Sequence, residues 1–277
     1  LGDSFMEALQ VEFEESLPSL LERQLAEKTG RKVEVWNAGV SGWGTDDELR
    51  YLTRYGLAWK PDLILVAMTL HNDVSDNMRE DWHTLESDQL VERPREQMPE
   101  LTYRSLELKA YLATRFQLYQ LWRKVRHGPV IREVGRQLNT HIVELFREPP
   151  SPRIERGYRL TDLLLQRLDS VARANDARMA MVLLPLKVQL SDSAFSEFVQ
   201  EAGSTPEEMP IERPQQLMTA TATRLGVPLV DLLPSFREAV MGRNAALYAS
   251  DGHWNAEGHR LATDVVVEGL INASVVR

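Results

Sequence analysis

Apolar residues recur every three or four positions over much of this chain, which is the spacing of one face of an α-helix. This spacing predicts a first helix over residues 5–29, bent at Pro18 and ended by Gly30. Thr45 and Glu48 have the spacing of a capping box at the start of a second helix that runs to about residue 59. Later stretches with the same periodicity predict helices over residues 158–175, 214–225, 234–240 and 256–271.

Short stretches between these helices have a different pattern, with alternating or continuous apolar residues. They predict β-strands over residues 33–37, 63–68, 179–184 and 227–230. Strands that alternate with helices predict an α/β fold, with a mostly parallel sheet covered by helices on both faces. A further strand is expected directly before Ser4, and most of it would lie ahead of Leu1.

One long stretch departs from this alternation. Residues 76–152 are rich in Glu, Arg and Gln, and their periodicity predicts helices over 101–125 and 131–146. We interpret 76–152 as a helical insertion, and as a candidate lid, in a single domain that spans residues 1–277. Residues 191–214 contain three prolines and many polar residues, which favours a long loop or short helices.

Composition and charge narrow the function. A length of 277 residues suits one large α/β domain with an insertion. The net charge of −9 argues against nucleic acid as a partner, since phosphate binding needs a basic surface. The chain has no cysteine, which excludes thiolate metal sites, disulfides and a cysteine nucleophile. No apolar run reaches the roughly 18 residues that span a membrane. An export signal or anchor ahead of Leu1 would fit, so an extracytoplasmic location is favoured, while the oligomeric state stays open.

Chemically versatile residues gather in loops that follow predicted strands or precede predicted helices. A serine at the start of a helix lies near free backbone N–H groups, which stabilise the negative charge formed when a serine attacks a carbonyl. Three further loops carry Asn, Asp or His. The four loops are Gly2-Asp3-Ser4, residues 37–42, His71-Asn72-Asp73 and Asp251-Gly252-His253-Trp254-Asn255.

The ordered set of loops resembles the SGNH family of GDSL-type hydrolases, whose four blocks supply a Ser, a Gly, an Asn and a His. Gly2-Asp3-Ser4 matches the first block, residues 37–42 the second, Asn72-Asp73 the third, and Asp251 with His253 the last. The resemblance spans nearly the whole chain apart from the insertion. It implies a three-layer sandwich with a flavodoxin-like sheet, a serine esterase activity and no cofactor or metal.

The resemblance also implies a role for each block. Ser4 would be the nucleophile, His253 its general base, and Asp251 the group that orients the imidazole. The oxyanion hole would be formed by the backbone N–H groups of Ser4 and Gly42 and by the side-chain amide of Asn72. A glycine would suit position 42 because a closely approaching backbone leaves no room for a Cβ.

Other residues in these blocks have supporting or alternative roles. Gly39 is the alternative to Gly42 in the oxyanion hole. Asp3 and Asp73 are expected to support their turns, and His259 to be structural. A metal site built from His71, Asp73 and His83 is an alternative that lacks a recognised ligand spacing.

Two blocks depart from the family pattern. Asp251 precedes His253 by two residues instead of three, so the loop must tighten at Gly252 for the carboxylate to reach the ring. The Asp-x-His-Trp form also resembles enzymes that acetylate alginate. In the third block, His71 stands where the family has a glycine.

The sequence therefore predicts a serine esterase that cleaves or transfers a small acyl group. An acetyl ester on a carbohydrate is favoured because Trp43 and Trp254 flank the blocks and sugars stack on aromatic rings. Two alternatives remain, a carbohydrate O-acetyltransferase and a non-catalytic relative that binds polysaccharide.

Overall fold

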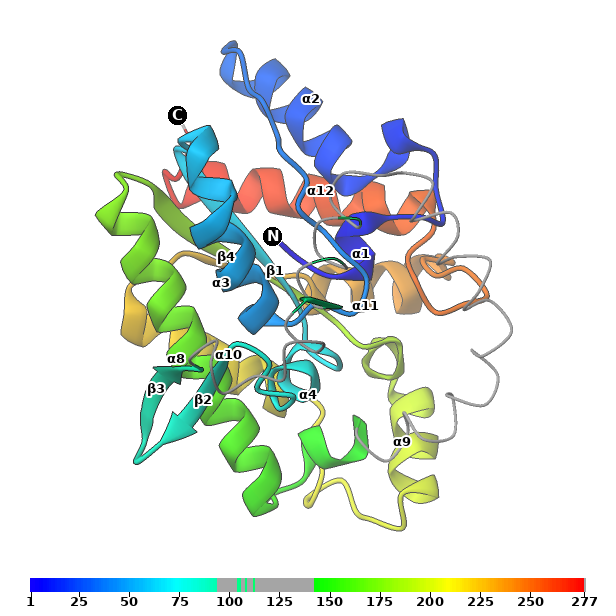
Figure 1. Cartoon of the computed structure of the whole chain (residues 1–277). Coiled ribbons are helices and arrows are strands. Elements are labelled where there is room, and N and C mark those ends of the chain that lie inside the picture. Colours follow the sequence, from blue (N-terminus) through cyan, green and yellow to red (C-terminus); the bar gives the residue numbers. More distant parts are fainter. Residues whose placement is uncertain (94–103, 106–107, 109–111, 113–141, 277) are drawn as a thin grey trace.

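The computed structural model describes residues 1–93, 104–105, 108, 112 and 142–276 (Figure 1). A three-stranded parallel sheet has the order β1 (Leu63–Thr69), β4 (Arg178–Leu184) and β5 (Leu229–Asp231). The backbone of Leu1 and Gly2 extends it beyond β1. Ala67 N–H donates to the Leu1 carbonyl at 3.1 Å, and Gly2 forms a parallel bridge with Gly39. The predicted α/β fold with a parallel sheet is confirmed.

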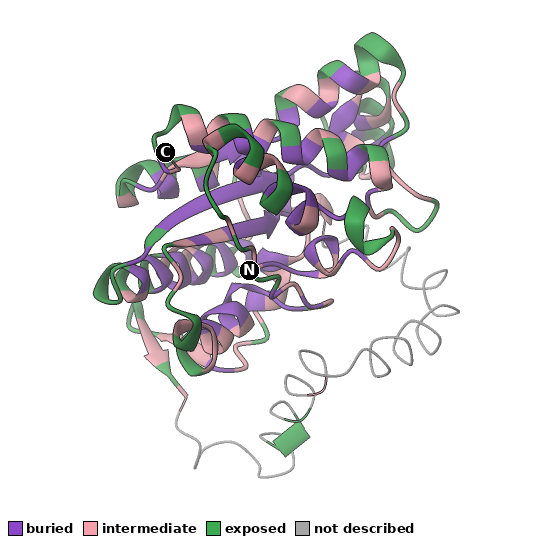
Figure 2. Ribbon diagram, turned by 90° about the horizontal axis from the view of Figure 1, so that it is seen from above, coloured by how far each residue is buried: buried purple, intermediate pink, exposed green. Residues whose placement is uncertain are grey.

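Side chains of the sheet alternate between two hydrophobic clusters, one on each face. In β4, Met179, Met181 and Leu183 join the first cluster, and Ala180, Val182 and Leu184 join the second. A strand that is buried on both faces needs a continuous apolar run, which is what β1 and β4 have. Figure 2 shows these buried strands lying between the helices.

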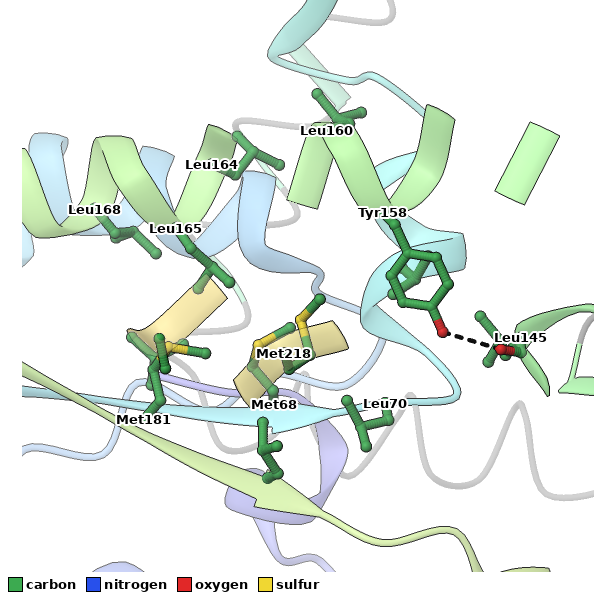
Figure 3. Packing of buried hydrophobic residues seen from close by; sticks show 14 of the residues in the cluster. Met68, Leu70, Leu145, Tyr158, Leu160, Leu164, Leu165, Leu168, Met181 and Met218 are labelled. Carbon is green, nitrogen blue, oxygen red and sulfur yellow. Dashed lines mark hydrogen bonds between the residues drawn. The ribbon is translucent and has the colours of Figure 1, made fainter. Parts of the chain in front are cut away.

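The first cluster is covered by α3 (Thr45–Arg54), α8 (Pro152–Ala174) and α10 (Arg213–Leu225). Leu164, Leu165 and Leu168 of α8 are fully buried there, next to Met68 and Met181 of the strands (Figure 3). The second cluster is covered by α1 (Ser4–Glu7), α2 (Leu17–Thr29), α11 (Leu233–Arg243) and α12 (Ala256–Asn272). The helices therefore form the two outer layers.

The predicted helix over residues 5–29 is wrong as a single element. α1 ends at Ala8, which adopts a left-handed conformation with φ of 55°. A 3₁₀-helix, η1 (Phe13–Glu15), follows, and Pro18 lies in the first turn of α2 instead of bending a longer helix. Proline suits that position because the first N–H groups of a helix have no intrahelical acceptor. Gly30 ends α2 with φ of 65°, as predicted.

The second predicted helix is also shorter than expected. α3 ends at Arg54, and a 3₁₀-helix, η2 (Gly56–Trp59), follows it. The N-cap of α3 is Gly44, whose N–H donates to the Asp47 side chain at 3.3 Å. The predicted capping box of Thr45 with Glu48 is therefore wrong. The side chain of Glu48 is instead fully buried, and this burial raises its pKa to about 8.

Residues 33–37 do not form the predicted strand. They have no strand partner in the described part of the chain: the neighbouring Gly39 forms a bridge with Gly2, and the Val35 N–H donates to the Glu22 side chain. Trp36 is therefore left exposed, where it stacks on Trp59 with ring centroids 3.9 Å apart.

A β-hairpin that the sequence did not predict lies within the proposed insertion. It consists of β2 (His83–Glu86) and β3 (Gln89–Glu92), joined by Ser87 and Asp88, both with positive φ. It follows α4 (Asp73–Asn77). Most of the helices predicted over 101–125 and 131–146 lie outside the described residues, although 142–146 are helical.

The remaining elements follow the sequence more closely. α8 begins at Pro152, six residues before the predicted start, because the Ser151 side chain accepts the N–H of Ile154 and caps the helix there. Residues 191–214 contain α9 (Asp192–Glu201), preceded by the 3₁₀-helix η4 (Lys187–Leu190). Among the described residues, no helix combines the length and the apolar character needed to cross a membrane.

Candidate active site

Ser4 and His253 lie side by side although they are far apart in sequence. The Oγ of Ser4 is 2.9 Å from Nε2 of His253, within hydrogen-bonding distance. Ser4 is the first residue of α1, directly after the edge of the sheet, and His253 lies in the loop before α12. An imidazole in this position can take the proton of the hydroxyl when the oxygen attacks an electrophile.

α1 differs from the helix that the sequence predicted, which changes the electrostatic argument for Ser4. A four-residue helix has almost no macrodipole, so it contributes little long-range stabilisation of an anion. Among the N–H groups at the start of α1, that of Ser4 remains as a candidate donor to an anion. The N–H of Phe5 is taken by the Asp3 side chain at 2.9 Å, and that of Met6 by the Asp3 carbonyl.

Asp251 lies against the imidazole on the side away from Ser4. Its Oδ2 is 3.4 Å from Nδ1 of His253, slightly beyond an ordinary hydrogen bond, and its Oδ1 accepts the His253 backbone N–H at 3.1 Å. Gly252 has φ of 90°, which tightens the loop as the two-residue spacing requires. Catalytic hydrogen bonds are often this long without substrate.

Gln10 is a second partner of this carboxylate. Its Nε2 donates to Oδ2 of Asp251 at 3.1 Å, the oxygen that also faces His253. Burial works to raise the pKa of Asp251, but the His253 backbone N–H, the imidazole and the Gln10 amide outweigh it. The pKa of Asp251 therefore lies below its usual range, and the group is ionised at neutral pH.

Asp3 connects the serine to the third block. Its fully buried side chain accepts three hydrogen bonds of 2.9 Å: from Phe5 N–H and Thr69 Oγ1 at Oδ1, and from Asn72 Nδ2 at Oδ2. Asp3 thus supports its turn as expected. It also fixes the end of β1 and the amide of Asn72.

The two glycines proposed for the oxyanion hole have different surroundings. Gly42 has φ of 79°, and a Cβ there would meet nothing within 4 Å, so glycine is required by the backbone conformation and not by lack of space. Gly39 is tightly packed, because a Cβ would lie 2.5 Å from Met6 and 2.6 Å from the backbone of Glu7. Close approach therefore explains Gly39 and does not explain Gly42.

His71 lies close to the other site residues. The rings of Phe5 and His71 form a T-shaped pair with centroids 6.2 Å apart, and the Phe5 ring also contacts His253, with centroids 5.1 Å apart. Burial lowers the pKa of His71 to about 4, and nearby His253 acts in the same direction against the attraction of Asp3. His71 is therefore neutral at physiological pH.

Asp73 supports the same loop from inside. Its Oδ2 accepts the backbone N–H of Thr69 at 2.9 Å, and the side chain is buried. Burial raises the pKa of Asp73 well above its usual range, and the charges of Glu48 and Asp3 act in the same direction. Asp73 therefore has the supporting position that the sequence predicted.

The other histidines considered from the sequence have structural partners. His259 is buried, and its Nδ1 accepts the backbone N–H of Leu17 at 3.3 Å. Nδ1 of His83 lies 2.6 Å from Oδ1 of Asp46, not beside Asp73. The described residues contain no cluster of His, Asp or Glu suited to a metal ion.

The two tryptophans expected to offer sugar-stacking surfaces are buried. Trp43 is 9% exposed and Trp254 is fully buried, where it packs edge-on against Phe5 and against Phe236. The expectation that they form an exposed platform is wrong. Trp254 instead supports the aromatic ring on which His253 rests.

Some residues of this site were not found from the sequence. Thr69, Gln10 and Glu7 contact the proposed blocks, yet none has a motif of its own. Thr69 is the last residue of β1, so its position two before His71 was the available signal. Gln10 contacts a residue 241 positions away, which no local pattern indicates.

This chain is similar to a known protein family and to several solved structures. The model of the GDSL-like lipase/acylhydrolase family matches residues 1–178. LAE5, an α/β-hydrolase enzyme from the metagenome of Lake Arreo in Spain, has a similar structure, with a TM-score of 0.52 and 16% identity over 97% of this chain and 91% of its own.

Two esterase structures are also similar. The acetyl xylan esterase AlAXEase has a TM-score of 0.51 and 14% identity over 98% of this chain and 96% of its own. A catalytic mutant of Axe2, an acetylxylan esterase from Geobacillus stearothermophilus, has a TM-score of 0.50 and 12% identity over 97% of this chain and 91% of its own. At these identities the likeness concerns the fold.

A comparison with curated protein sequences gave no match. The resemblance of Asp251–Trp254 to alginate-acetylating enzymes finds no support in the family model or in the structures just described. With a family model that covers more than half of its length, the chain belongs to the GDSL-like lipase/acylhydrolase family and is an ester hydrolase.

Proposed function

We propose that this enzyme is a serine esterase that removes a small acyl group, an acetyl group in the first instance, from a carbohydrate. The observation that carries the mechanism is the 2.9 Å contact between Ser4 Oγ and His253 Nε2. The carbohydrate acetyl ester is suggested by the activity named for AlAXEase and Axe2, which share the fold.

In this proposal, Ser4 Oγ attacks the ester carbonyl carbon while His253 Nε2 takes the hydroxyl proton. Asp251 stabilises the imidazolium that forms, through its carboxylate at Nδ1. The tetrahedral intermediate collapses as the C–O bond of the sugar ester breaks, and His253 returns the proton to the leaving sugar oxygen. Water then attacks the acyl-Ser4 ester by the same route and releases the carboxylic acid.

The negative charge on the former carbonyl oxygen needs donors that are already in place. We assign these to the backbone N–H groups of Ser4 and Gly42 and to the side-chain amide of Asn72. Removal of one such donor typically costs about 10²–10³ in kcat. Asn72 is held for this purpose by its hydrogen bond to Asp3, and Gly42 by a turn whose closing hydrogen bond does not use its N–H.

The experiment compares hydrolysis of p-nitrophenyl acetate by the intact protein with that by the Ser4→Ala and His253→Ala variants. Both substitutions are expected to remove activity almost completely, and a fluorophosphonate probe is expected to label Ser4 alone. Equal turnover by Ser4→Ala, or labelling of another serine, would show that the mechanism is wrong.

The substrate class needs its own measurement, namely release of acetate from acetylated xylooligosaccharides, followed by mass spectrometry. An added acceptor sugar distinguishes hydrolysis from acyl transfer, because transfer moves the acetyl mass to the acceptor. Activity on p-nitrophenyl acetate without any release from acetylated sugars would keep the mechanism and reject the carbohydrate substrate.

A further inference from the structure

The backbone around Gly42 forms a tight turn that leaves one N–H group out of its own hydrogen bond. The N–H of Trp43 donates to the carbonyl of Val40 at 3.0 Å and closes the turn. Gly42 has φ of 79°, the conformation that a type II turn requires at its third residue. Because the closing bond uses Trp43, the Gly42 N–H takes no part in it. We call residues 40–43 the oxyanion turn.

Glu7 holds this turn from the side of the serine. Its Oε2 accepts the backbone N–H of Ser41 at 2.7 Å, directly before Gly42. Glu7 is the last residue of α1, the helix that begins with Ser4, and its own N–H donates to the Asp3 carbonyl at 3.0 Å. One short helix therefore carries Ser4 at its start and a contact to the oxyanion turn at its end.

Arg79 holds the same turn from the opposite side. Its Nη2 donates to the carbonyl of Gly42 at 2.9 Å and to Oδ2 of Asp47 at 2.9 Å. Its Nη1 donates to Oδ1 of Asp76 at 3.2 Å, and its Nε lies 3.3 Å from Oδ2 of Asp81. Asp76 belongs to α4, the helix that follows Asn72. Arg79 thus connects the turn to the element that carries the Asn72 amide.

We propose that Glu7 and Arg79 are positioning residues for the oxyanion hole. They fix Ser41 N–H and Gly42 C=O on either side of the Gly42 N–H, and so set its direction relative to Ser4 and Asn72. This inference rests on the proposed serine esterase function and adds to it. Both would act through the backbone of Ser41 and Gly42, and neither belongs to the four sequence blocks.

Loss of either positioning contact should affect kcat more than KM, because the donor acts mainly in the transition state. An oxyanion donor contributes most in the transition state, where charge has developed, and a misdirected N–H loses much of that contribution. A loosened turn should therefore lower kcat and leave KM nearly unchanged. A purely structural role would instead lower the melting temperature and leave the ratio of kcat to KM intact in the folded enzyme.

The test uses matched variants of the whole chain with p-nitrophenyl acetate as substrate. Arg79→Met and Glu7→Leu remove each contact, while Glu7→Gln keeps an oxygen that can accept the Ser41 N–H. Arg159→Met is the control, since Arg159 pairs with Asp88 and Asp162 as Arg79 pairs with its three aspartates, but within the described residues it has no hydrogen bond to the four blocks. The Arg79 side chain is 42% exposed but pairs with three aspartates, so thermal unfolding of Arg79→Met is measured beside its kinetics.

We expect kcat to fall about 10–100-fold in Arg79→Met and Glu7→Leu, less than the roughly 10²–10³-fold for complete loss of an oxyanion donor because the donor is misdirected and not removed, with KM within two-fold. Affinity for a trifluoromethyl ketone, whose adduct with serine has an oxyanion, should fall by the same factor. Glu7→Gln should lose several-fold less than Glu7→Leu, and Arg159→Met should resemble the unmodified enzyme.

The outcomes separate this inference from the proposed function. Activity that survives Ser4→Ala rejects the function itself. If Ser4→Ala is inactive but Arg79→Met and Glu7→Leu retain kcat within two-fold, the serine mechanism stands and the positioning role is wrong. Should Glu7→Leu fail to fold, the affinity of Arg79→Met for the trifluoromethyl ketone is the deciding measurement. An affinity equal to that of the unmodified enzyme also overturns the inference.

Discussion

Asn72 and Asp3 are joined by a hydrogen bond of 2.9 Å, in which the side-chain amide donates to Oδ2 of the carboxylate. The side-chain amide nitrogen of asparagine carries two hydrogens. With one directed at Asp3, the second is fixed in direction and remains available for another acceptor. The carboxylate that caps α1 therefore also orients the amide proposed for the oxyanion hole.

Asn72→Ala should lower kcat by about 10²–10³-fold and leave KM nearly unchanged, because the amide would act mainly on the charge of the transition state. Steady-state hydrolysis of p-nitrophenyl acetate measures this. Asn175→Ala is the matched control, since its amide donates only locally to the Val171 carbonyl. Equal kcat for Asn72→Ala and the unmodified enzyme would contradict the assigned role.

Asp3→Ala should lower both stability and activity. Its side chain accepts from Phe5 N–H, Thr69 Oγ1 and Asn72 Nδ2, and removal leaves these donors without their partner. We expect a loss of about 2–3 kcal/mol in the free energy of unfolding, measured by urea denaturation. Activity should fall further than in Asn72→Ala at a temperature where both variants are folded. A drop in stability with full activity would show that Asp3 does not orient the site.

Asp251→Asn should lower kcat by 10²-fold or more, up to about the 10⁴-fold known for loss of the orienting carboxylate in a serine triad. Gln10→Leu should have a smaller effect, below about ten-fold, because it removes only a donor that holds the carboxylate. Asp264→Asn and Gln24→Leu are matched controls, since this second pair is also a glutamine amide on an aspartate at 2.6 Å. If Asp251→Asn and Asp264→Asn behave alike, the orienting role is wrong.

His259 predicts a pH dependence of stability. Burial lowers its pKa to about 4 from an ordinary value of 6.5, and its neutral Nδ1 accepts the Leu17 N–H. Between these values the unfolded chain binds a proton that the folded protein excludes. The contribution of neutral His259 to the free energy of unfolding is therefore complete above pH 6.5. It decreases as the pH falls towards 4, by at most about 3 kcal/mol.

The measurement is the free energy of unfolding of the unmodified protein and of His259→Gln, between pH 4 and pH 7. Glutamine keeps an acceptor oxygen but does not titrate. The difference between the two proteins should grow in favour of the variant as the pH falls. Parallel pH curves would contradict the assignment.

The strands buried on both faces were the most predictable part of the fold. β1 and β4 differ by one residue from their predicted bounds, because a run such as 63–68 has the length of a strand and leaves no polar face for solvent. The extended segment 33–37 has a strand pattern, yet pairing depends on a neighbouring backbone, which a local pattern does not contain. The β2–β3 hairpin was missed because Ser87 and Asp88 adopt positive φ without a glycine to indicate it.

The residues of the sequence blocks could be proposed from the sequence, whereas the contacts that hold them could not. Ser4, Asn72, Asp251 and His253 were proposed because the family resemblance gave their order along the chain, and the structure brings Ser4 to His253 and Asn72 to Asp3. The contacts of Gln10, Glu7 and Arg79 were not predictable, because each joins segments that are distant in sequence and leaves no local pattern. Glu7 is the last residue of α1, while Gln10 and Arg79 lie shortly after α1 and α4.

Gly42 has a consequence for the evolution of specificity. The residue is restricted by its backbone angle of 79°, while the space around its missing Cβ is open. Asparagine tolerates positive φ better than other residues with side chains. An asparagine at position 42 would therefore place a polar side chain in the open space beside the proposed oxyanion turn at a cost in backbone strain, which makes this position a point of entry for redesigning substrate preference.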